Sequence, residues 1–189
     1  MNALFTAAAD LERFCTGHGW RSCVIGGLAV QRWGEPRQTR DVDVALLTGL
    51  GTETAFIDPL VTHYRPRIPD ARQFAIDHRV VLVETATGIP LDISLAALPF
   101  EARVIERASV FPADSEPLIT TCSAEDLMVL KAFAGRVQDW LDIEGIIVRQ
   151  GLRFDRVLVA EELRPLLKLK DDVETEPKLQ SLFAKHSDA

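Results

Sequence analysis

The sequence predicts an α/β (α+β) fold in which a small mixed β-sheet flanked by helices is followed by a helical C-terminal part. Short apolar and β-branched runs alternate with helical patterns at first, whereas only helical patterns follow Ser123. A length of 189 residues suits one ordinary domain, or a core with a small helical appendage. We therefore expect an α/β core over residues 1–118 and a helical part, packed on that core, over residues 119–189.

The elements of the expected core follow from apolar spacing and from turn residues. Leu4, Ala8, Leu11 and Phe14 recur at helical spacing, and apolar runs bounded by glycine or proline predict the strands. The expected helices cover residues 3–16, 26–33, 53–63 and 101–107, and the expected strands cover residues 21–25, 39–47, 79–84, 90–95 and the vicinity of 110.

Two of these strands separate acidic from apolar side chains. Successive side chains of a strand point to opposite faces. On the strand over 39–47, Asp41 and Asp43 therefore share one face, and valines fill the other. On the strand over 90–95, Asp92 lies between leucine and isoleucine. An acid on such an inner strand needs a partner or a metal ion.

The C-terminal part reads as helices alone. Ser123 followed by Asp126 is a helix N-cap pattern. The expected helices cover residues 124–133, 139–149 and 154–169, with an acidic, loose segment over 171–177 before a last weak helix.

Composition and charge limit the classes of protein. Hydrophobic residues make up 47% and charged residues 26%, as in soluble globular proteins. The net charge of −7 argues against broad, sequence-independent binding to nucleic acid, but leaves room for a local basic groove. Two arginine clusters could form such a groove or a solvated surface: Arg32, Arg37 and Arg40, and Arg65, Arg67 and Arg72.

The cysteines and the apolar runs indicate the compartment. Cys15, Cys23 and Cys122 fit no metal-ligand spacing and are typical of a reducing environment. No apolar run reaches membrane-spanning length, and the N-terminus has no charged leader before an apolar stretch. We therefore expect a cytoplasmic protein with no membrane partner.

Asp41, Asp43 and Asp92 can converge on one face of the sheet. Carboxylates at short range repel each other, and a bound divalent cation is the usual reason to keep them together. Mg²⁺ prefers oxygen ligands and usually binds a substrate phosphate as well. Gly26 and Gly27 open a helix whose free backbone N–H groups can hold phosphate oxygens. The combination predicts a metal-dependent triphosphate site.

Several motifs resemble a known family. The segment from Gly26-Gly27-Leu28-Ala29 to Thr39-Arg40-Asp41-Val42-Asp43 resembles the signature of the nucleotidyltransferase β superfamily, and Asp92 resembles its third carboxylate. The segments 123–131 and 136–143 are similar to later motifs of the abortive-infection, AbiEii-type branch. That branch includes toxins of toxin–antitoxin pairs that transfer nucleotides to tRNA ends. The resemblance spans roughly residues 20 to 150.

The resemblance implies a nucleotidyltransferase core and a reaction. A nucleoside monophosphate would move from an NTP to an acceptor hydroxyl, with release of pyrophosphate. Asp41, Asp43 and Asp92 would hold one or two Mg²⁺ ions, or Asp92 would act as general base. Lys131 would pair with the nucleotide phosphates as a catalytic residue. Nucleotide contacts are implied for Gly26, Gly27, Thr39, Arg40 and Lys131.

The residues themselves suggest plainer roles for the later motifs. Lys131 and Asp142 would share a face only if one helix ran straight through Gly135. Otherwise Lys131 is a solvated lysine. Asp139 and Asp142 then supply helix-start charge, with Arg136 as an ion-pair partner.

The acceptor and the activity remain open from the sequence. An RNA or tRNA end, a small molecule such as an aminoglycoside, and a protein side chain are alternative acceptors, and a toxin-type enzyme would have a cognate antitoxin. A phosphodiesterase or nuclease could use the same acids, but the glycine pair suits a triphosphate better than a diester. A non-catalytic nucleotide-binding homologue or interaction partner is the last alternative, although such a protein has no physical need for adjacent like charges.

Overall fold

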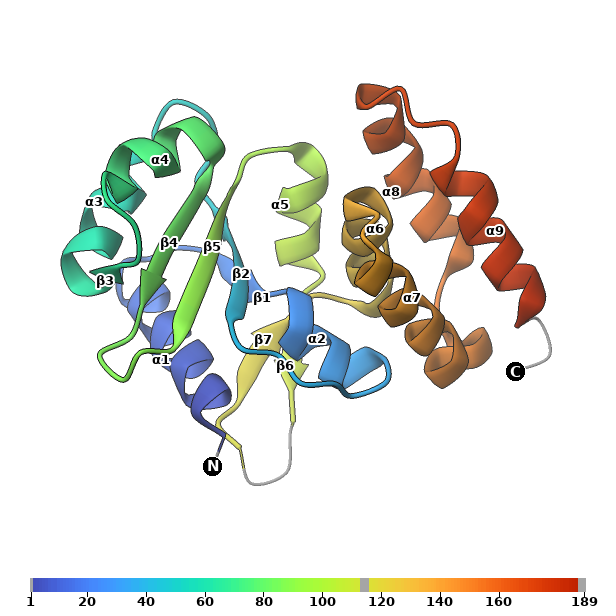
Figure 1. Cartoon of the computed structure of the whole chain (residues 1–189), viewed down its shortest axis with the longest axis horizontal. Helices are drawn as coiled ribbons and strands as arrows, with labels where there is room; N and C mark the ends of the chain where they lie inside the picture. The colour runs from blue at the N-terminus through green and yellow to red at the C-terminus, as the bar shows by residue number, and fades with distance from the viewer. Residues whose placement is uncertain (1, 113–115, 187–189) are drawn as a thin grey trace. The chain divides into compact units, whose positions relative to one another are not determined.

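The computed structural model describes residues 2–112 and 116–186. These residues form two compact units (Figure 1). The first unit contains the described residues up to 29 and from 38 to 122, and the second contains residues 30–37 and those from 123 onward. The first unit holds the sheet and the second holds helices, which confirms the expected α+β class.

Within the described residues, the first unit contains a seven-stranded sheet with strand order β3-β4-β5-β2-β1-β7-β6. Strand β2 runs parallel to β5, and β1 runs parallel to β7, whereas the other neighbours are antiparallel. The strands are β1 (Ser22–Val24), β2 (Val42–Leu47), β3 (Arg65–Pro66), β4 (Val80–Glu84), β5 (Pro90–Ala96), β6 (Ser109–Phe111) and β7 (Ile119–Thr121). The central pair is therefore β5 and β2, the two strands that carry the candidate acids.

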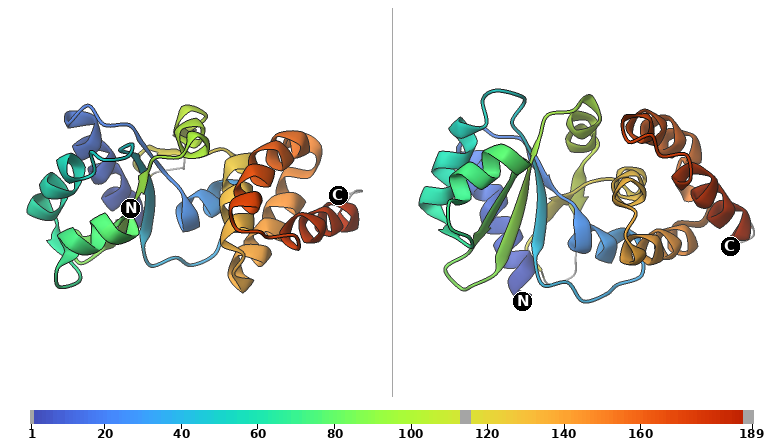
Figure 2. Two further views of the ribbon diagram at one scale, coloured as in Figure 1. Left: turned by 90° about the horizontal axis from the view of Figure 1, so that it is seen from above. Right: turned by 45° about the horizontal axis from the view of Figure 1, so that its top comes forward.

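Helices cover both faces of this sheet. Helices α1 (Ala3–Gly17), α3 (Thr54–His63) and α4 (Ala71–His78) lie on one face, where their apolar side chains join the core. Helix α5 (Pro99–Glu106) and the start of α2 (Gly26–Trp33) lie on the other face, as the view from above shows (Figure 2). The acidic face of β2 and β5 is consequently less completely covered than the apolar one.

The burial of β5 follows its sequence alternation. Leu91, Ile93 and Leu95 are buried in the core, whereas Asp92 and Ser94 are only half-buried on the opposite face. Because side chains alternate along a strand, the apolar set faces the helices and the polar set faces the less covered side.

In the first unit, the structure adds three elements that were not predicted and shortens one strand. Strand β3, helix α4 and strand β7 are absent from the expectations. Strand β2 begins at Val42 and not at Thr39, so Asp41 precedes it. The added strands contain two and three residues, and α4 follows Asp70, which has a φ of 51°. Strands of two or three residues carry too little periodicity to be recognised in a sequence.

The second unit is helical, as expected. Its main helices are α6 (Ala124–Ala134), α7 (Val137–Gln150), α8 (Arg156–Leu169) and α9 (Thr175–Lys185), with a 3₁₀ turn, η1 (Gly151–Arg153), between α7 and α8. The Ser123 hydroxyl accepts the N–H of Asp126 at 3.1 Å, which is the predicted N-cap bond of α6. Helix α7 starts two residues earlier than predicted. Among the described residues, no helix is long and apolar enough to cross a membrane.

Candidate functional site

Asp41, Asp43 and Asp92 come together at the centre of the sheet. Asp43 on β2 and Asp92 on β5 are register partners in a parallel pair, and Asp41 lies directly before β2. Each of the three residues offers a carboxylate oxygen, and these oxygens all lie within 4.8 Å of one another. We call these residues the carboxylate cluster. The face that the alternation assigned to the acids is thus the face on which they meet.

Gly26 brings the backbone of the β1–α2 turn against Asp43. The N–H of Ile25 donates to the Asp43 carbonyl oxygen at 2.9 Å, which places the next residue beside the Asp43 side chain. Gly26 has a φ of 60°, and a Cβ there would lie 1.9 Å from Oδ2 of Asp43. Only glycine therefore fits this position. The N–H of Gly27 donates to the same Oδ2 at 3.4 Å.

Gly27 makes an equivalent approach to Thr39. A Cβ on Gly27 would lie 2.4 Å from Oγ1 of Thr39. That hydroxyl donates to Oδ1 of Asp41 at 2.8 Å. The two glycines thus fix two members of the carboxylate cluster, one directly and one through Thr39.

Arg67 is a member of the site that the sequence did not identify. It forms an ion pair with Asp92, in which the two side chains are 27% and 31% exposed. Burial raises the pKa of the Asp92 carboxyl, Arg67 opposes this rise, and Asp41 adds to it, so that the pKa of Asp92 lies above its usual value. The sequence placed Arg67 only in an arginine cluster, since nothing local relates it to Asp92.

The donor set of the carboxylate cluster fits a hard divalent cation. It consists of oxygen donors only, without histidine or cysteine, and such a set suits Mg²⁺ rather than Zn²⁺. The nearby turn at Gly26 presents backbone N–H groups at the start of an eight-residue helix, where anions are stabilised. Arg40, next to Asp41 in the chain, is exposed.

Lys131 belongs to the second unit and is buried, with 5% of its surface exposed. Its Nζ lies 3.2 Å from Oδ1 of Asp139 and 2.6 Å from Oδ2 of Asp142. Gly135 caps the C-terminal end of α6, and its φ of 68° turns the chain so that α7 packs back on α6. The interpretation of Lys131 as a solvated lysine is therefore wrong. Lys131 contacts Asp142 although no single helix runs straight through Gly135, because α6 and α7 pack together.

Arg37 completes this arrangement. Its Nε and Nη2 donate to the two carboxylate oxygens of Asp142 at 2.7 and 2.9 Å. Burial raises the pKa of Asp142, but the hydrogen bonds from Arg37 and Lys131 outweigh it, so that the pKa lies below its usual value. Burial also raises the pKa of Asp139, but Arg136 and Lys131 outweigh it, so that this pKa too lies below its usual value. We call Arg37, Lys131, Asp139 and Asp142 the Lys131 cluster.

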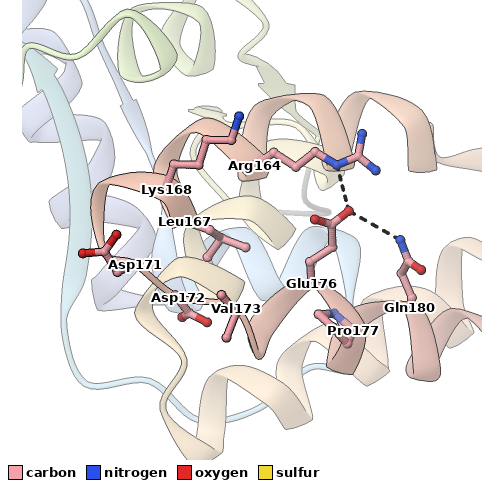
Figure 3. A pocket seen from close by; sticks show the side chains of 9 residues that line it. All are labelled: Arg164, Leu167, Lys168, Asp171, Asp172, Val173, Glu176, Pro177 and Gln180. Carbon is pink, nitrogen blue, oxygen red and sulfur yellow. Dashed lines mark hydrogen bonds and ion pairs between the residues drawn. The ribbon is translucent and has the colours of Figure 1, made fainter.

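The second unit also has a surface hollow between α8 and α9 (Figure 3). Nε of Arg164 donates to Oε1 of Glu176 at 2.8 Å, and Gln180 donates to the same oxygen at 3.5 Å. Three of the polar side chains drawn there, those of Arg164, Glu176 and Gln180, thus bind one another, and no member of the carboxylate cluster lines the hollow. We assign the hollow no function.

Comparisons with known proteins give a likeness in structure only. The sequence matches no protein-family profile and no curated protein. The crystal structure of an antigenic nucleotidyltransferase-like protein from Paracoccidioides brasiliensis aligns with a TM-score of 0.52 at 14% identity, covering 96% of this chain and 92% of that one. At this identity the likeness shows a shared fold.

Two further solved structures align with lower scores. The lincosamide antibiotic adenylyltransferase LnuA, with lincomycin bound, gives a TM-score of 0.48 at 13% identity, covering 72% of this chain and 92% of that one. The antibiotic-resistance factor ANT(2'')-Ia gives 0.43 at 14% identity, covering 96% of this chain and 91% of that one.

Proposed function

We propose that this protein is a magnesium-dependent nucleotidyltransferase, which transfers a nucleoside monophosphate from an NTP to an acceptor hydroxyl. The observation that carries the proposal is the carboxylate cluster beside a helix start whose two glycines have no room for a side chain. Carboxylates would bind the metal ion, and backbone N–H groups at a helix start would bind a phosphate. The shared fold with a protein described as nucleotidyltransferase-like agrees with this reading.

Residues of the first unit would bind the metal ion and the triphosphate. Asp41 and Asp43 would hold the metal, and Thr39 would keep the Asp41 carboxylate in its orientation through the 2.8 Å bond. Gly26 and Gly27 would direct backbone N–H groups toward the triphosphate, with Arg40 near its outer oxygens. A bound Mg²⁺ supplies Lewis-acid stabilisation of charge on the phosphate oxygens.

Asp92 would complete the ligand set or receive the proton of the acceptor hydroxyl. In the transfer, the acceptor oxygen forms a bond to the α-phosphorus, and the bond from that phosphorus to the bridging oxygen breaks. Pyrophosphate leaves with the electron pair, and the hydroxyl proton passes to the Asp92 carboxylate. A carboxyl whose pKa lies above its usual value accepts a proton more readily than an ordinary aspartate.

We propose an RNA end, such as a tRNA terminus, as the first acceptor to test. The resemblance of the motifs to AbiEii-type toxins supports this choice and implies a cognate antitoxin. The net charge of −7 favours instead a small-molecule or protein acceptor. Phosphate contact by Lys131 stays a prediction, since the ammonium engages two carboxylates within its own unit.

The test is incubation of the full chain with each α-labelled NTP, Mg²⁺ and total cellular RNA, scoring labelled RNA and released pyrophosphate. We expect label on a small RNA, lost in Asp43→Asn and retained in Asp77→Asn, which changes an exposed acid of α4. Release of pyrophosphate without labelled RNA would indicate that the acceptor is a small molecule or a protein. No label and no pyrophosphate, with nucleotide still bound, would refute transferase activity and favour a non-catalytic binding protein.

A further inference from the structure

Arg67 lies in line with the acids across four neighbouring chain segments. Its N–H donates to the carbonyl oxygen of Leu82 at 3.1 Å, extending the ladder between β3 and β4 by one residue. Leu82 is the register partner of Asp92, and Asp92 is the register partner of Asp43. Because register partners share a face, these four residues form one row on the side of the carboxylate cluster.

The Arg67 side chain passes over its direct neighbour to reach Asp92. Adjacent strands lie about 4.8 Å apart, so the chain segments of Arg67 and Asp92 are about 10 Å apart. Arg65, two residues earlier on the same edge, pairs instead with its own register partner Glu84. The two arginines lie on the same face of one chain segment. Only Arg67 contacts the carboxylate cluster.

The Arg67 side chain can also leave Asp92 with little loss of stability. It directly follows the two-residue edge strand β3, and its side chain is 27% exposed. The next helix begins after Asp70, so residues 67–70 form a connection between elements. A partly exposed ion pair contributes little to stability, so a divalent cation can compete with it for the carboxylate.

We propose that Arg67 is an exchangeable counter-ion that occupies the third carboxylate until metal and nucleotide arrive together. It neutralises Asp92 while the carboxylate cluster lacks a metal ion. It must leave Asp92 when that carboxylate coordinates a divalent cation. The released guanidinium stays tethered beside the site, where it can bind phosphate oxygens in a forked geometry. This inference rests on the proposed function, since it needs a metal and an NTP at this cluster.

The proposal has a signature in which two affinities change in opposite directions. Without Arg67, Mn²⁺ alone binds more tightly because its competitor for Asp92 is gone. In the presence of Mn²⁺, a nucleotide binds less tightly to the protein without Arg67, because a contact to its phosphates is lost. An arginine that only supports the fold would weaken both affinities.

The experiment measures Mn²⁺ binding to the full chain by the paramagnetic resonance of free Mn²⁺, and then the binding of a non-hydrolysable NTP in the presence of Mn²⁺. In Arg67→Ala we expect about three- to tenfold tighter Mn²⁺ and about tenfold weaker nucleotide. Arg67→Lys keeps the charge without the fork, so its Mn²⁺ affinity should stay near that of the parent. Arg65→Ala is the matched control, and it should change neither affinity.

The outcomes distinguish a failure of the Arg67 proposal from a failure of the metal site. If the parent and Arg65→Ala bind Mn²⁺ but Arg67→Ala binds it no more tightly than the parent does, the role of Arg67 is overturned and the metal site stays intact. No Mn²⁺ binding in either the parent or Arg67→Ala would overturn the metal site itself, and with it both proposals. Thermal unfolding of each variant confirms that folded proteins are compared.

Discussion

Asp43 and Asp92 are direct register partners on the adjacent parallel strands β2 and β5, so two acids face each other across the centre of the sheet. Like charges placed opposite one another destabilise a sheet. Arg67 offsets part of this repulsion at Asp92. We expect the arrangement to cost stability, and the proposed metal site would give it a reason.

The first prediction concerns this cost. Asp43→Asn keeps the shape of the side chain and removes one like charge, so we expect the free energy of unfolding without metal to rise by about 0.5–1 kcal/mol. Urea unfolding in a chelator measures it, and Mn²⁺ binding should be lost in the same variant. A destabilisation greater than about 1 kcal/mol would show that Asp43 supports the fold instead.

The second prediction concerns Gly26. Gly26→Ala combines a left-handed φ with a Cβ placed 1.9 Å from Oδ2 of Asp43, so the carboxylate must move. We expect about 2–3 kcal/mol of destabilisation and loss of Mn²⁺ binding. Gly88→Ala is the control, because Gly88 has a φ of 81° and nothing within 4 Å of its added Cβ. Intact Mn²⁺ binding in Gly26→Ala would contradict the close approach.

The third prediction concerns Thr39, a positioning residue for Asp41. Thr39→Val removes the 2.8 Å hydrogen bond while keeping the branched shape. We expect kcat to fall about tenfold, with a stability change within about 1 kcal/mol. Thr39→Ser keeps the hydroxyl and should restore most of the rate. Equal rates for the valine and serine variants would show that the hydroxyl is dispensable.

The fourth prediction concerns pH and Asp142. The pKa of Asp142 is lower in the folded protein than the value of about 3.9 expected when unfolded, so the unfolded state binds the proton first. The stabilisation is complete above about pH 5 and is lost as pH falls from there through the unfolded pKa to the lowered folded pKa.

We therefore expect Asp142→Asn to unfold about 3 kcal/mol more easily at pH 7, with a difference that shrinks below about pH 4. Urea unfolding at several pH values checks this result. Glu161→Gln, an exposed change on α8, serves as the control. A difference that stays constant down to pH 3 would mean that the charge of Asp142 does not stabilise the fold.

The fifth prediction separates two roles of Lys131. Lys131→Met leaves Asp139 and Asp142 buried without the ammonium, and we expect about 3 kcal/mol of destabilisation. If Lys131 also contacts phosphates, nucleotide affinity should fall about tenfold further than in Asp142→Asn, which disturbs the same cluster. Calorimetry below both unfolding temperatures measures this. Equal affinities in the two variants would assign Lys131 to the cluster alone.

Much of the fold could be predicted because the signals are local. The alternation around Asp92 predicted β5 and its faces, and Ser123 with Asp126 predicted the start of α6. The glycine pair and the three acids could be recognised as a candidate site from residue type and spacing. These features depend on neighbours within a few positions along the chain.

Other features depend on contacts between distant segments. Arg67 and Asp92 are 25 residues apart, and Arg37 and Asp142 are 105 apart. Strand β7 exists because β1 and β6 offer it partners. None of these pairings leaves a periodic trace in the sequence.

By itself the sequence determined the fold class, the central strands and the identity of the candidate acids, since periodicity and turn residues act over short spans. Only the tertiary structure decided that Asp43 faces Asp92, that glycine is obligatory at position 26, and that Lys131 is buried between two carboxylates. The physical reason is that strand register and helix packing set which side chains meet, and both are decided by burial over the whole chain.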